Sequence, residues 1–285
     1  MRRPFYGWII VAVGFLISFT ESGVFQNILS IFMKPMVSEF GWSRASVTGA
    51  ISFGSVSGGL LSLAVGPVLD RYGPRMVGFW GILFLSLGLV AMTFVESIWQ
   101  LYLFFGVGRM IAVGVLGLAV SVSVANWFVR HRGRAMGIAR IGDRLGGALL
   151  PLMVQFFILA IGWRLAWSGL GIVVFLMSGI PTLIFLRHRP EDMGLRPDGA
   201  LPPVDKGRPA DTGGSGEACR EDPEPVWTRS QATRTKTFWT LTFVCSLIPF
   251  AQAGVNFHIF PFLTDQGFPE TTAVLVLTTI AVFGM

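Results

Sequence analysis

Long apolar stretches of about bilayer length, separated by short polar connections, dominate this sequence. A helix needs roughly 20 mostly apolar residues to cross ~30 Å of hydrocarbon. Seven stretches reach that length, at residues 8–32, 47–69, 76–94, 98–124, 135–161, 165–186 and 238–263. An eighth begins near Thr271, and a helix from there to Met285 rises only about 22 Å, so we expect the sequence to stop inside a span. The pattern predicts an all-α polytopic membrane protein.

One long polar stretch, residues 189–236, interrupts this series after the sixth span. It is rich in proline and glycine and poor in large apolar residues, so it cannot bury enough surface to offset its ordering entropy. We therefore predict a six-helix transmembrane bundle at 1–188, a flexible cytoplasmic linker at 189–236 and the start of a second, truncated bundle at 237–285. A repeat supports two halves, because aromatic residues open the first and seventh spans and a Gly-aromatic turn follows each.

The distribution of basic residues predicts the orientation in the membrane. Only 13% of the 285 residues are charged, against about 25% in soluble proteins. The N-terminus and the connections on its side of the membrane hold nine arginines, whereas the connections on the opposite side hold three basic residues. This asymmetry indicates a cytoplasmic N-terminus in the plasma (inner) membrane. The net charge of +6 then reflects this asymmetry and no nucleic-acid surface. The nine are Arg2, Arg3, Arg71, Arg75, Arg130, Arg132, Arg134, Arg187 and Arg189, and the three are Lys34, Arg44 and Arg164.

The connection after the second span holds the sharpest motif, Gly66-Pro-Val-Leu-Asp70-Arg71-Tyr-Gly73-Pro-Arg75. Asp70 lies at the C-terminal end of a helix, where the helix dipole disfavours an acid, so we expect a cationic partner. The candidates are Arg71, Arg75 and Arg134. Gly73 and Pro74 are expected to form the turn into the next helix. A tight turn flanked by positive-inside arginines is the alternative interpretation.

This loop resembles the signature loop of the major facilitator superfamily, with Pro74 in place of one basic residue. Gly162-Trp-Arg164, the segment from Arg189 to Gly199 and the segment Phe40-Gly-Trp-Ser-Arg44 further resemble monocarboxylate and oxalate/formate transporters. The resemblance implies the major facilitator fold, here an N-terminal six-helix bundle plus helix 7 and part of helix 8. It also implies that Gly66, Asp70, Arg71, Gly73 and Arg75 act as a conformational latch.

Ionisable residues set deep inside the spans are the candidate transport site. Arg109 and Arg144 are the candidate anion-binding residues, and Glu21 and Asp143 are the candidate proton-coupling residues, because charges in a span are costly and mark solute or proton pathways. With Arg140, three arginines face two carboxylates, which leaves one positive charge suited to an anion. The alternatives are that Asp143 and Arg140 neutralise each other structurally, with Arg140 reaching the cytoplasmic face, and that Glu21 is a water-exposed carboxyl near the outer mouth.

Two amides complete the predicted substrate-binding set. Gln26 stands where animal lactate carriers, by the resemblance, place a lysine, and a neutral amide cannot take that residue's proton-coupled role. Asn256 lies on the seventh span.

The sequence thus favours a monomeric secondary transporter of small organic anions such as mono- or dicarboxylates, a symporter or antiporter driven by protons or exchange. A non-transporting sensor or scaffold is the alternative. No catalytic, nucleotide or metal motif occurs, so we expect neither an enzyme nor a cofactor.

Overall fold

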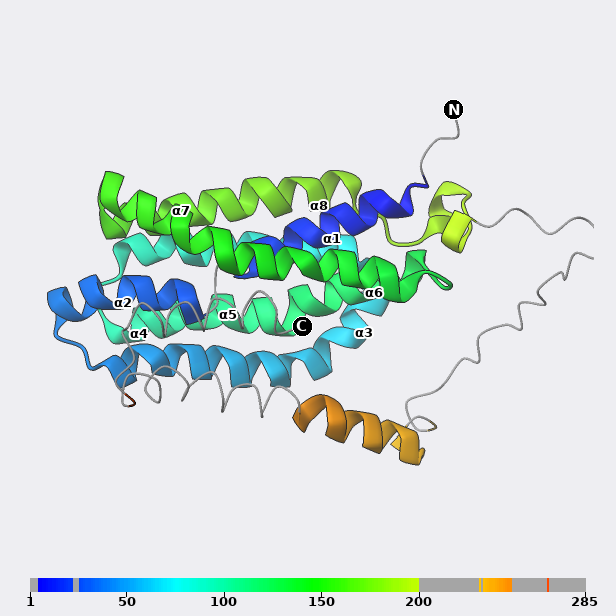
Figure 1. Ribbon diagram of the computed structural model, residues 1–285, viewed down its shortest axis with the longest axis horizontal. Coiled ribbons are helices and arrows are strands. Elements are labelled where there is room, and N and C mark those ends of the chain that lie inside the picture. Colours follow the sequence, from blue (N-terminus) through cyan, green and yellow to red (C-terminus); the bar gives the residue numbers. More distant parts are fainter. Residues whose placement is uncertain (1–4, 23–25, 200–230, 232, 248–265, 267–285) are drawn as a thin grey trace, which may run out of the picture. The chain divides into compact units, whose positions relative to one another are not determined.

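The computed structural model describes residues 5–22, 26–199, 231, 233–247 and 266. The chain forms two compact units, Met1–Pro203 and Val204–Met285. In the first unit, helices run side by side along most of its length (Figure 1). In the second unit, residues 236–247 are helical. The described residues contain helices and no strand, which confirms the all-α prediction.

The first unit follows a simple order of helices. In chain order the α-helices are α1 (Gly7–Glu21), α2 (Gln26–Phe40), α3 (Arg44–Ala91), α4 (Ile98–Leu101), α5 (Val107–Ile111), α6 (Gly117–Trp127), α7 (Arg132–Val174) and α8 (Ile180–Phe185). Short 3-10 helices are η2 (Met92–Phe94), η6 (Pro190–Met193) and η7 (Pro197–Gly199), and π-helical stretches are η3 (Tyr102–Gly106), η4 (Ala112–Leu116) and η5 (Phe175–Gly179).

Three continuous helical runs within the described residues are long and apolar enough to cross a membrane: Arg44–Phe94, Ile98–Trp127 and Arg132–Phe185. The first and third each contain two of the predicted spans. A single glycine with non-helical backbone angles separates the two spans, Gly73 (φ 76°) in α3 and Gly162 (φ 83°) in α7. Positive φ values cost glycine little, which is why glycine occupies both turns. The predicted turn at Gly73 is therefore confirmed.

Packing against the run Ile98–Trp127 shows that the chain reverses at Gly73. Before Gly73, residues further along α3 contact residues further along the run, so this half of α3 is parallel to that run. After Gly73, residues further along α3 contact residues earlier in the run, so the second half of α3 is antiparallel to it. The packing pairs are Gly49 with Tyr102, Gly58 with Val113, Gly88 with Phe104 and Gly78 with Ala119.

The first predicted span, residues 8–32, contains α1 and the first part of α2, and residues 23–25 between them lie outside the described residues. α1 ends at Glu21, and α2 resumes at Gln26 and continues to Phe40. The hydroxyls of Thr20 and Ser22 donate to backbone carbonyls of the preceding turn, as the hydroxyl of Ser123 does inside α6. Lys34, expected in a connection, lies within α2.

Small residues let α1 and α7 approach closely. A Cβ on Gly142 or Gly146 would overlap the backbone of Phe15 or Phe19 in α1. Gly137 and Gly147, on the same helix, have no atom within 4 Å of such a Cβ. The glycine-rich pattern in this span is thus a packing device at two positions, as close helix packing in lipid requires.

The segment after α8 is held against one end of this bundle. We call residues 187–199 the strap. Trp127 Nε1 donates to the Arg187 carbonyl at 3.2 Å, and Asn126 Nδ2 donates to the His188 carbonyl at 3.3 Å. The Asp198 carboxylate accepts hydrogen bonds from the backbone N–H groups at the start of α7. The sequence predicted a flexible linker from residue 189, whereas these bonds hold residues up to 199, because Asp198 meets backbone donors that have no helical partner.

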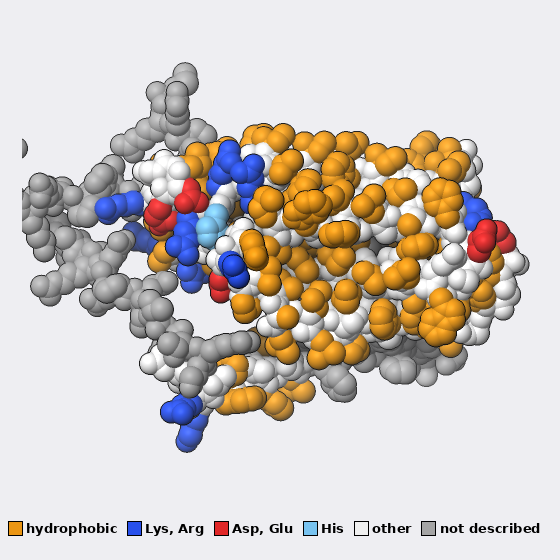
Figure 2. Space-filling view, turned by 180° about the vertical axis from the view of Figure 1, so that it is seen from behind, with side chains coloured by type: hydrophobic (Ala, Val, Ile, Leu, Met, Phe, Trp, Pro, Cys, Tyr) orange, Lys and Arg blue, Asp and Glu red, His pale blue; other side chains and the backbone are white. Residues whose placement is uncertain are grey.

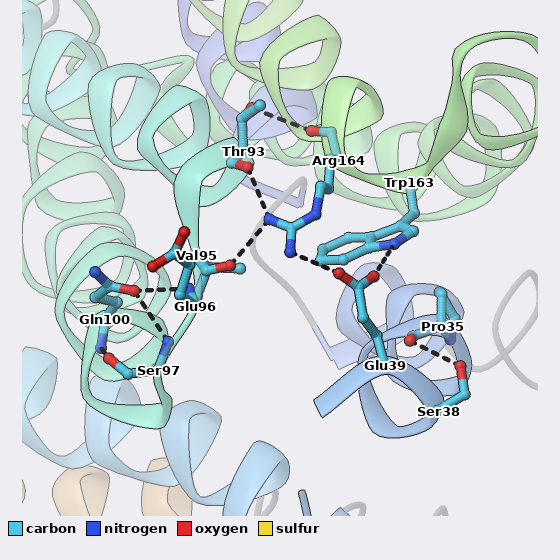
Figure 3. A network of polar contacts seen from close by, with 10 residues as sticks. All are labelled: Pro35, Ser38, Glu39, Thr93, Val95, Glu96, Ser97, Gln100, Trp163 and Arg164. Carbon is cyan, nitrogen blue, oxygen red and sulfur yellow. Dashed lines mark hydrogen bonds and ion pairs between the residues drawn. The ribbon is translucent and has the colours of Figure 1, made fainter. Parts of the chain in front are cut away.

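A second polar network ties the opposite end together (Figure 3). Arg164 Nη2 donates to Glu39 Oε1 at 2.7 Å, and Trp163 Nε1 donates to Glu39 Oε2 at 3.0 Å. Arg164 Nη1 also donates to the carbonyls of Thr93 and Val95. The hydrogen bond from Arg164 and that from Trp163 hold the pKa of the Glu39 carboxyl below its usual value. This network joins α2, the connection after α3 and the turn inside α7.

Between the two polar ends lies an apolar belt. Figure 2 shows hydrophobic side chains covering the middle of one face, with charged side chains gathered toward its ends. A belt of exposed apolar side chains with polar ends is what lipid contact requires.

Candidate functional site

Glu21, at the C-terminal end of α1, is the most buried ionisable side chain of the predicted site. It is 7% exposed, in a helix whose other residues are almost all apolar. Arg140, Asp143 and Arg109 lie within electrostatic range of its carboxylate. The structure therefore brings together residues of α1, α5 and α7 that are far apart in the sequence, and the interpretation of Glu21 as a water-exposed group does not fit this burial.

Gly117, the first residue of α6, is the point where two of these side chains meet. A Cβ placed on it would lie 3.7 Å from both Arg140 Nη2 and Glu21 Oε1. Arg140 Nη2 also donates to the Gly117 carbonyl at 3.2 Å and to Ser121 Oγ at 3.3 Å. The guanidinium of Arg140 is thus directed at the neighbouring helix, and it is a site residue that the sequence analysis left outside the substrate-binding set.

Arg109 occupies a short stretch of α-helix, α5, between two π-helical stretches, η3 and η4. Such π-helical turns are rare and recur at functional sites. Arg109 is half-buried, and its Nε donates to Ser55 Oγ of α3 at 2.9 Å. The Glu21 carboxylate lies within electrostatic range of it. Ser55 could not be identified from the sequence because its hydroxyl is one of many in these helices.

Asp143 and Arg144 lie on α7 near this cluster. Asp143 is half-buried, and both Arg140 and Arg144 interact electrostatically with its carboxylate. Arg144 itself is exposed in the described part of the chain. The structure thus places Asp143 between two arginines, whereas Arg144 lies at the edge of the cluster.

The structure does not describe the side chains of the two predicted amides. The backbone of Gln26 begins α2, but its side chain lies outside what the structure describes. Asn256 lies outside the described residues.

The predicted latch residues lie around the turn at Gly73. Asp70 is exposed and makes no ion pair with any residue that the structure describes, so the expected partners Arg71, Arg75 and Arg134 do not meet it. Arg71 lies over the Tyr72 ring, 5.3 Å from its centroid, and Arg75 Nε donates to the Leu183 carbonyl at 2.9 Å. A Cβ on Gly66 would have no neighbour within 4 Å. Arg71 and Arg75 thus contact other groups, and the predicted pairing with Asp70 is absent among the described residues.

Comparison with known proteins identifies the family. The sequence profile of the Major Facilitator Superfamily matches residues 9–285. The chain belongs to this superfamily. The predicted family and the all-α major facilitator fold are confirmed, and the chain is an integral, multi-pass membrane protein.

Several members of the superfamily resemble the chain. It is 31% identical over 179 residues to MFS-type transporter 1 of Ophiocordyceps sp., covering 61% of this chain and 39% of that protein. It is 28% identical over 225 residues to the riboflavin transporter RibJ of Trypanosoma brucei brucei, covering 77% and 40%. It is 28% identical over 156 residues to a probable L-galactonate transporter of Escherichia coli, covering 54% and 34%.

The superfamily match decides the broad class of the chain and leaves its chemistry open. The chain spans about two fifths of the length of the first of these relatives. These relatives are named as transporters and not as enzymes, as the sequence predicted. Their named substrates differ, so the superfamily match alone does not select the solute.

Proposed function

We propose that the protein is a secondary active transporter that moves small organic anions, of the mono- or dicarboxylate class, across the membrane by alternating access. The observation that carries the proposal is the cluster of Glu21, Arg109, Arg140 and Asp143 on apolar helices, in which Glu21 is buried, Arg109 and Asp143 are half-buried and Arg140 is exposed. Charges inside a membrane bundle are costly and are kept where they face a substrate, an ion or one another. A carboxylate substrate meets the excess positive charge of this cluster.

The charges of the cluster favour an anion. Arg109, Arg140 and Arg144 face Glu21 and Asp143, which leaves one positive charge. Arginine can bind a carboxylate through two parallel hydrogen bonds, and Arg109 uses its Nε toward Ser55, which fixes the plane of its guanidinium. We infer that Arg109 is the principal anchor for the substrate carboxylate. The relative named for L-galactonate, a carboxylate, supports this class.

Glu21 gives the cluster a way to couple anion binding to protons or to exchange. In the absence of substrate, Glu21 lies within electrostatic range of Arg109 and Arg140. A substrate carboxylate that takes over these arginines leaves the Glu21 carboxyl without its counter-charges. Since an unpaired carboxylate in an apolar bundle is costly, Glu21 then takes up a proton. Asp143, between Arg140 and Arg144, is the second carboxyl placed for this exchange.

The proposed arrangement in the membrane follows the charges at the two ends. The end with Asp70, Arg130 and Arg187 is cytoplasmic, together with the N-terminus, by the positive-inside rule. The superfamily match extends past the first unit to residue 285, which supports a six-helix bundle at 1–188, a linker at 189–236 and the start of a second bundle at 237–285. We propose a monomer in the plasma (inner) membrane, with the latch loop around Asp70 controlling the change between outward-facing and inward-facing states.

Uptake into proteoliposomes tests the proposal directly. The full-length protein, reconstituted with an imposed pH gradient, should show saturable uptake of at least one labelled mono- or dicarboxylate. Arg109→Lys should reduce this uptake strongly, because an ammonium cannot reproduce the planar two-bond contact of a guanidinium. Arg130→Lys, a like change at an exposed position outside the cluster, is the matched control and should transport as the wild type does.

Two results would contradict the proposal. Wild-type uptake by Arg109→Lys and Arg109→Gln would remove Arg109 from the site. Saturable binding of a carboxylate without any flux would instead favour the sensor or scaffold.

A further inference from the structure

A pocket of about 420 Å³ opens at the strap end of the first unit, between the strap and the part of α3 that follows Gly73. None of its lining residues belongs to the charged cluster. Its walls combine a basic side and an apolar side. This combination is the starting point for a binding site that the proposed transport mechanism does not use.

Two arginines and one carboxylate line the basic side, which leaves it one positive charge. Arg75 is fixed by the bond from its Nε to the Leu183 carbonyl, and its terminal nitrogens make no bond to any described residue. The Arg187 side chain makes no hydrogen bond within the described part of the chain. Asp192 already accepts a bond from the Arg189 backbone N–H at 3.2 Å. The pocket therefore offers guanidinium donors to an anion.

His188 lines the same pocket, and one nitrogen of its ring is buried without a partner in the described part of the chain. Its Nδ1 is buried and has no hydrogen-bond partner among the described residues. The ring packs against the turn, since a Cβ on Gly73 would lie only 2.9 Å from this nitrogen. A buried polar atom without a partner is unusual in proteins and commonly marks a place where water or an ion completes the bonding.

The apolar side of the pocket continues into the lipid-facing surface. Met76 lines the pocket and is 45% exposed. Trp80 and Phe84 follow it at intervals of four residues, so the three side chains lie along one face of α3, and both aromatic residues are also exposed. An exposed apolar stripe of this kind, beginning at a basic pocket, fits a molecule with a charged head and a long apolar tail.

We propose that this pocket binds the phosphate group of an anionic phospholipid, with an acyl chain lying along Met76, Trp80 and Phe84. Basic pockets between membrane helices bind such headgroups, and each arginine near the surface strengthens the attraction. Inorganic phosphate shares the chemistry of the headgroup, but it makes no use of the apolar stripe. A lipid, unlike free phosphate, contacts both the basic and the apolar wall of the pocket.

Lipid retention by the purified full-length protein tests this assignment. The protein is reconstituted in vesicles of equal phosphatidylglycerol and phosphatidylcholine, extracted in mild detergent, and its bound phospholipid is measured by mass spectrometry. The wild type should retain phosphatidylglycerol in preference. Arg187→Gln should weaken this retention about fivefold, and Arg187→Lys, which keeps a point charge, should restore most of it. Arg75→Gln is the second variant, and helix content and melting in pure phosphatidylcholine show whether each variant is folded.

The controls separate the pocket from general attraction and the lipid from free phosphate. Arg130→Gln removes one exposed charge from the same end of the bundle without touching the pocket, and it should retain phosphatidylglycerol as the wild type does. Equal losses in Arg130→Gln and Arg187→Gln, or equal retention of the two lipids by the wild type, would overturn the proposal. Displacement of phosphatidylglycerol by millimolar inorganic phosphate would show a site for the free ion and would also overturn it.

Discussion

Asp198 offers the sharpest test of how the strap holds the bundle. Its carboxylate accepts hydrogen bonds from the backbone N–H groups of Val129, Arg130 and His131, at 2.9, 2.6 and 3.4 Å, and lies 3.3 Å from the His131 ring. These donors directly precede α7 and have no partner within the helix. Asp198→Ala removes all of these bonds in one substitution.

The expected loss of stability follows from the number and kind of these bonds. Loss of one capping side chain costs about 0.5–2 kcal/mol, and hydrogen bonds to a charged group are worth about 1.5–3 kcal/mol each. The freed donors of Arg130 and His131 are in exposed residues, so water replaces part of the loss. We therefore expect Asp198→Ala to destabilise the first unit by about 2 kcal/mol. At about 2–4 °C per kcal/mol for a unit of this size, the melting temperature falls by about 4–8 °C.

Thermal melting in detergent, followed by the loss of helix signal, measures this change. Glu191→Gln is the matched control, since it removes one negative charge from an exposed position in the same strap. Its melting temperature should stay within about one degree of the wild type, a change expected for a surface substitution. If Asp198→Ala melts together with Glu191→Gln, the carboxylate does not hold the strap, and the reasoning from its hydrogen bonds is refuted.

The same carboxylate predicts an acid-sensitive stability. Burial alone raises the pKa of Asp198, but hydrogen bonds from the backbone N–H groups of Arg130 and Val129 and from His131 outweigh burial and lower it below its ordinary value of 3.8. A carboxyl whose pKa is lower in the folded state stabilises the fold above its ordinary pKa and loses that contribution as the pH falls through the folded value. The wild type should therefore lose more melting temperature than Asp198→Ala between about pH 5 and pH 3.

Three further predictions concern other parts of the first unit. Glu39→Gln should lower the melting temperature at pH 7 and make the fall of the melting temperature in acid less steep. The hydrogen bond from Arg164 lowers the pKa of Glu39, so the carboxylate's contribution to stability is lost as the pH drops through that lowered value. An unchanged acid profile would contradict this. Gly146→Ala should destabilise the unit by about 1–3 kcal/mol in a melting experiment, whereas Gly147→Ala, with open space around it, should not; similar melting of both would count against close packing with α1. Asp70→Asn should slow turnover in proteoliposomes and leave substrate affinity within a few fold, and a loss of affinity with normal turnover would argue against a latch.

The sequence predicted most of the helical architecture because apolar length is a direct signal of a span. The turns at Gly73 and Gly162 were also predictable, since glycine at a polar break between two apolar runs is the residue that tolerates positive φ. The end of α1 at Glu21 was not predictable in the same way. The apolar pattern continues past Glu21, and the hydroxyl bonds of Thr20 and Ser22 give no signal, because Ser123 and Ser178 make the same kind of bond inside continuous helices.

The candidate site was predictable in its membership but not in its geometry. Depth along each span singled out Glu21, Arg109 and Asp143 as intramembrane charges. Depth says nothing about helix rotation, so the sequence could not show that Arg140 turns toward α6. The meeting point, Gly117, has no side chain and therefore carries no chemical signal in the sequence. The π-helical stretches around Arg109 likewise depend on packing that no local pattern of residues reveals.

The position of the strap in the chain has a consequence for the synthesis of the protein. Tyr6, at the start of α1, donates to the Phe185 carbonyl, and the strap begins two residues later. A ribosome releases the chain from its N-terminus, and domains fold as units once their sequence has emerged. The helices up to α8 are therefore available before the residues that bind their ends together. Asp198 reaches the start of α7 only after it has left the ribosome, so the last residues of the first unit determine when its helices become joined at this end.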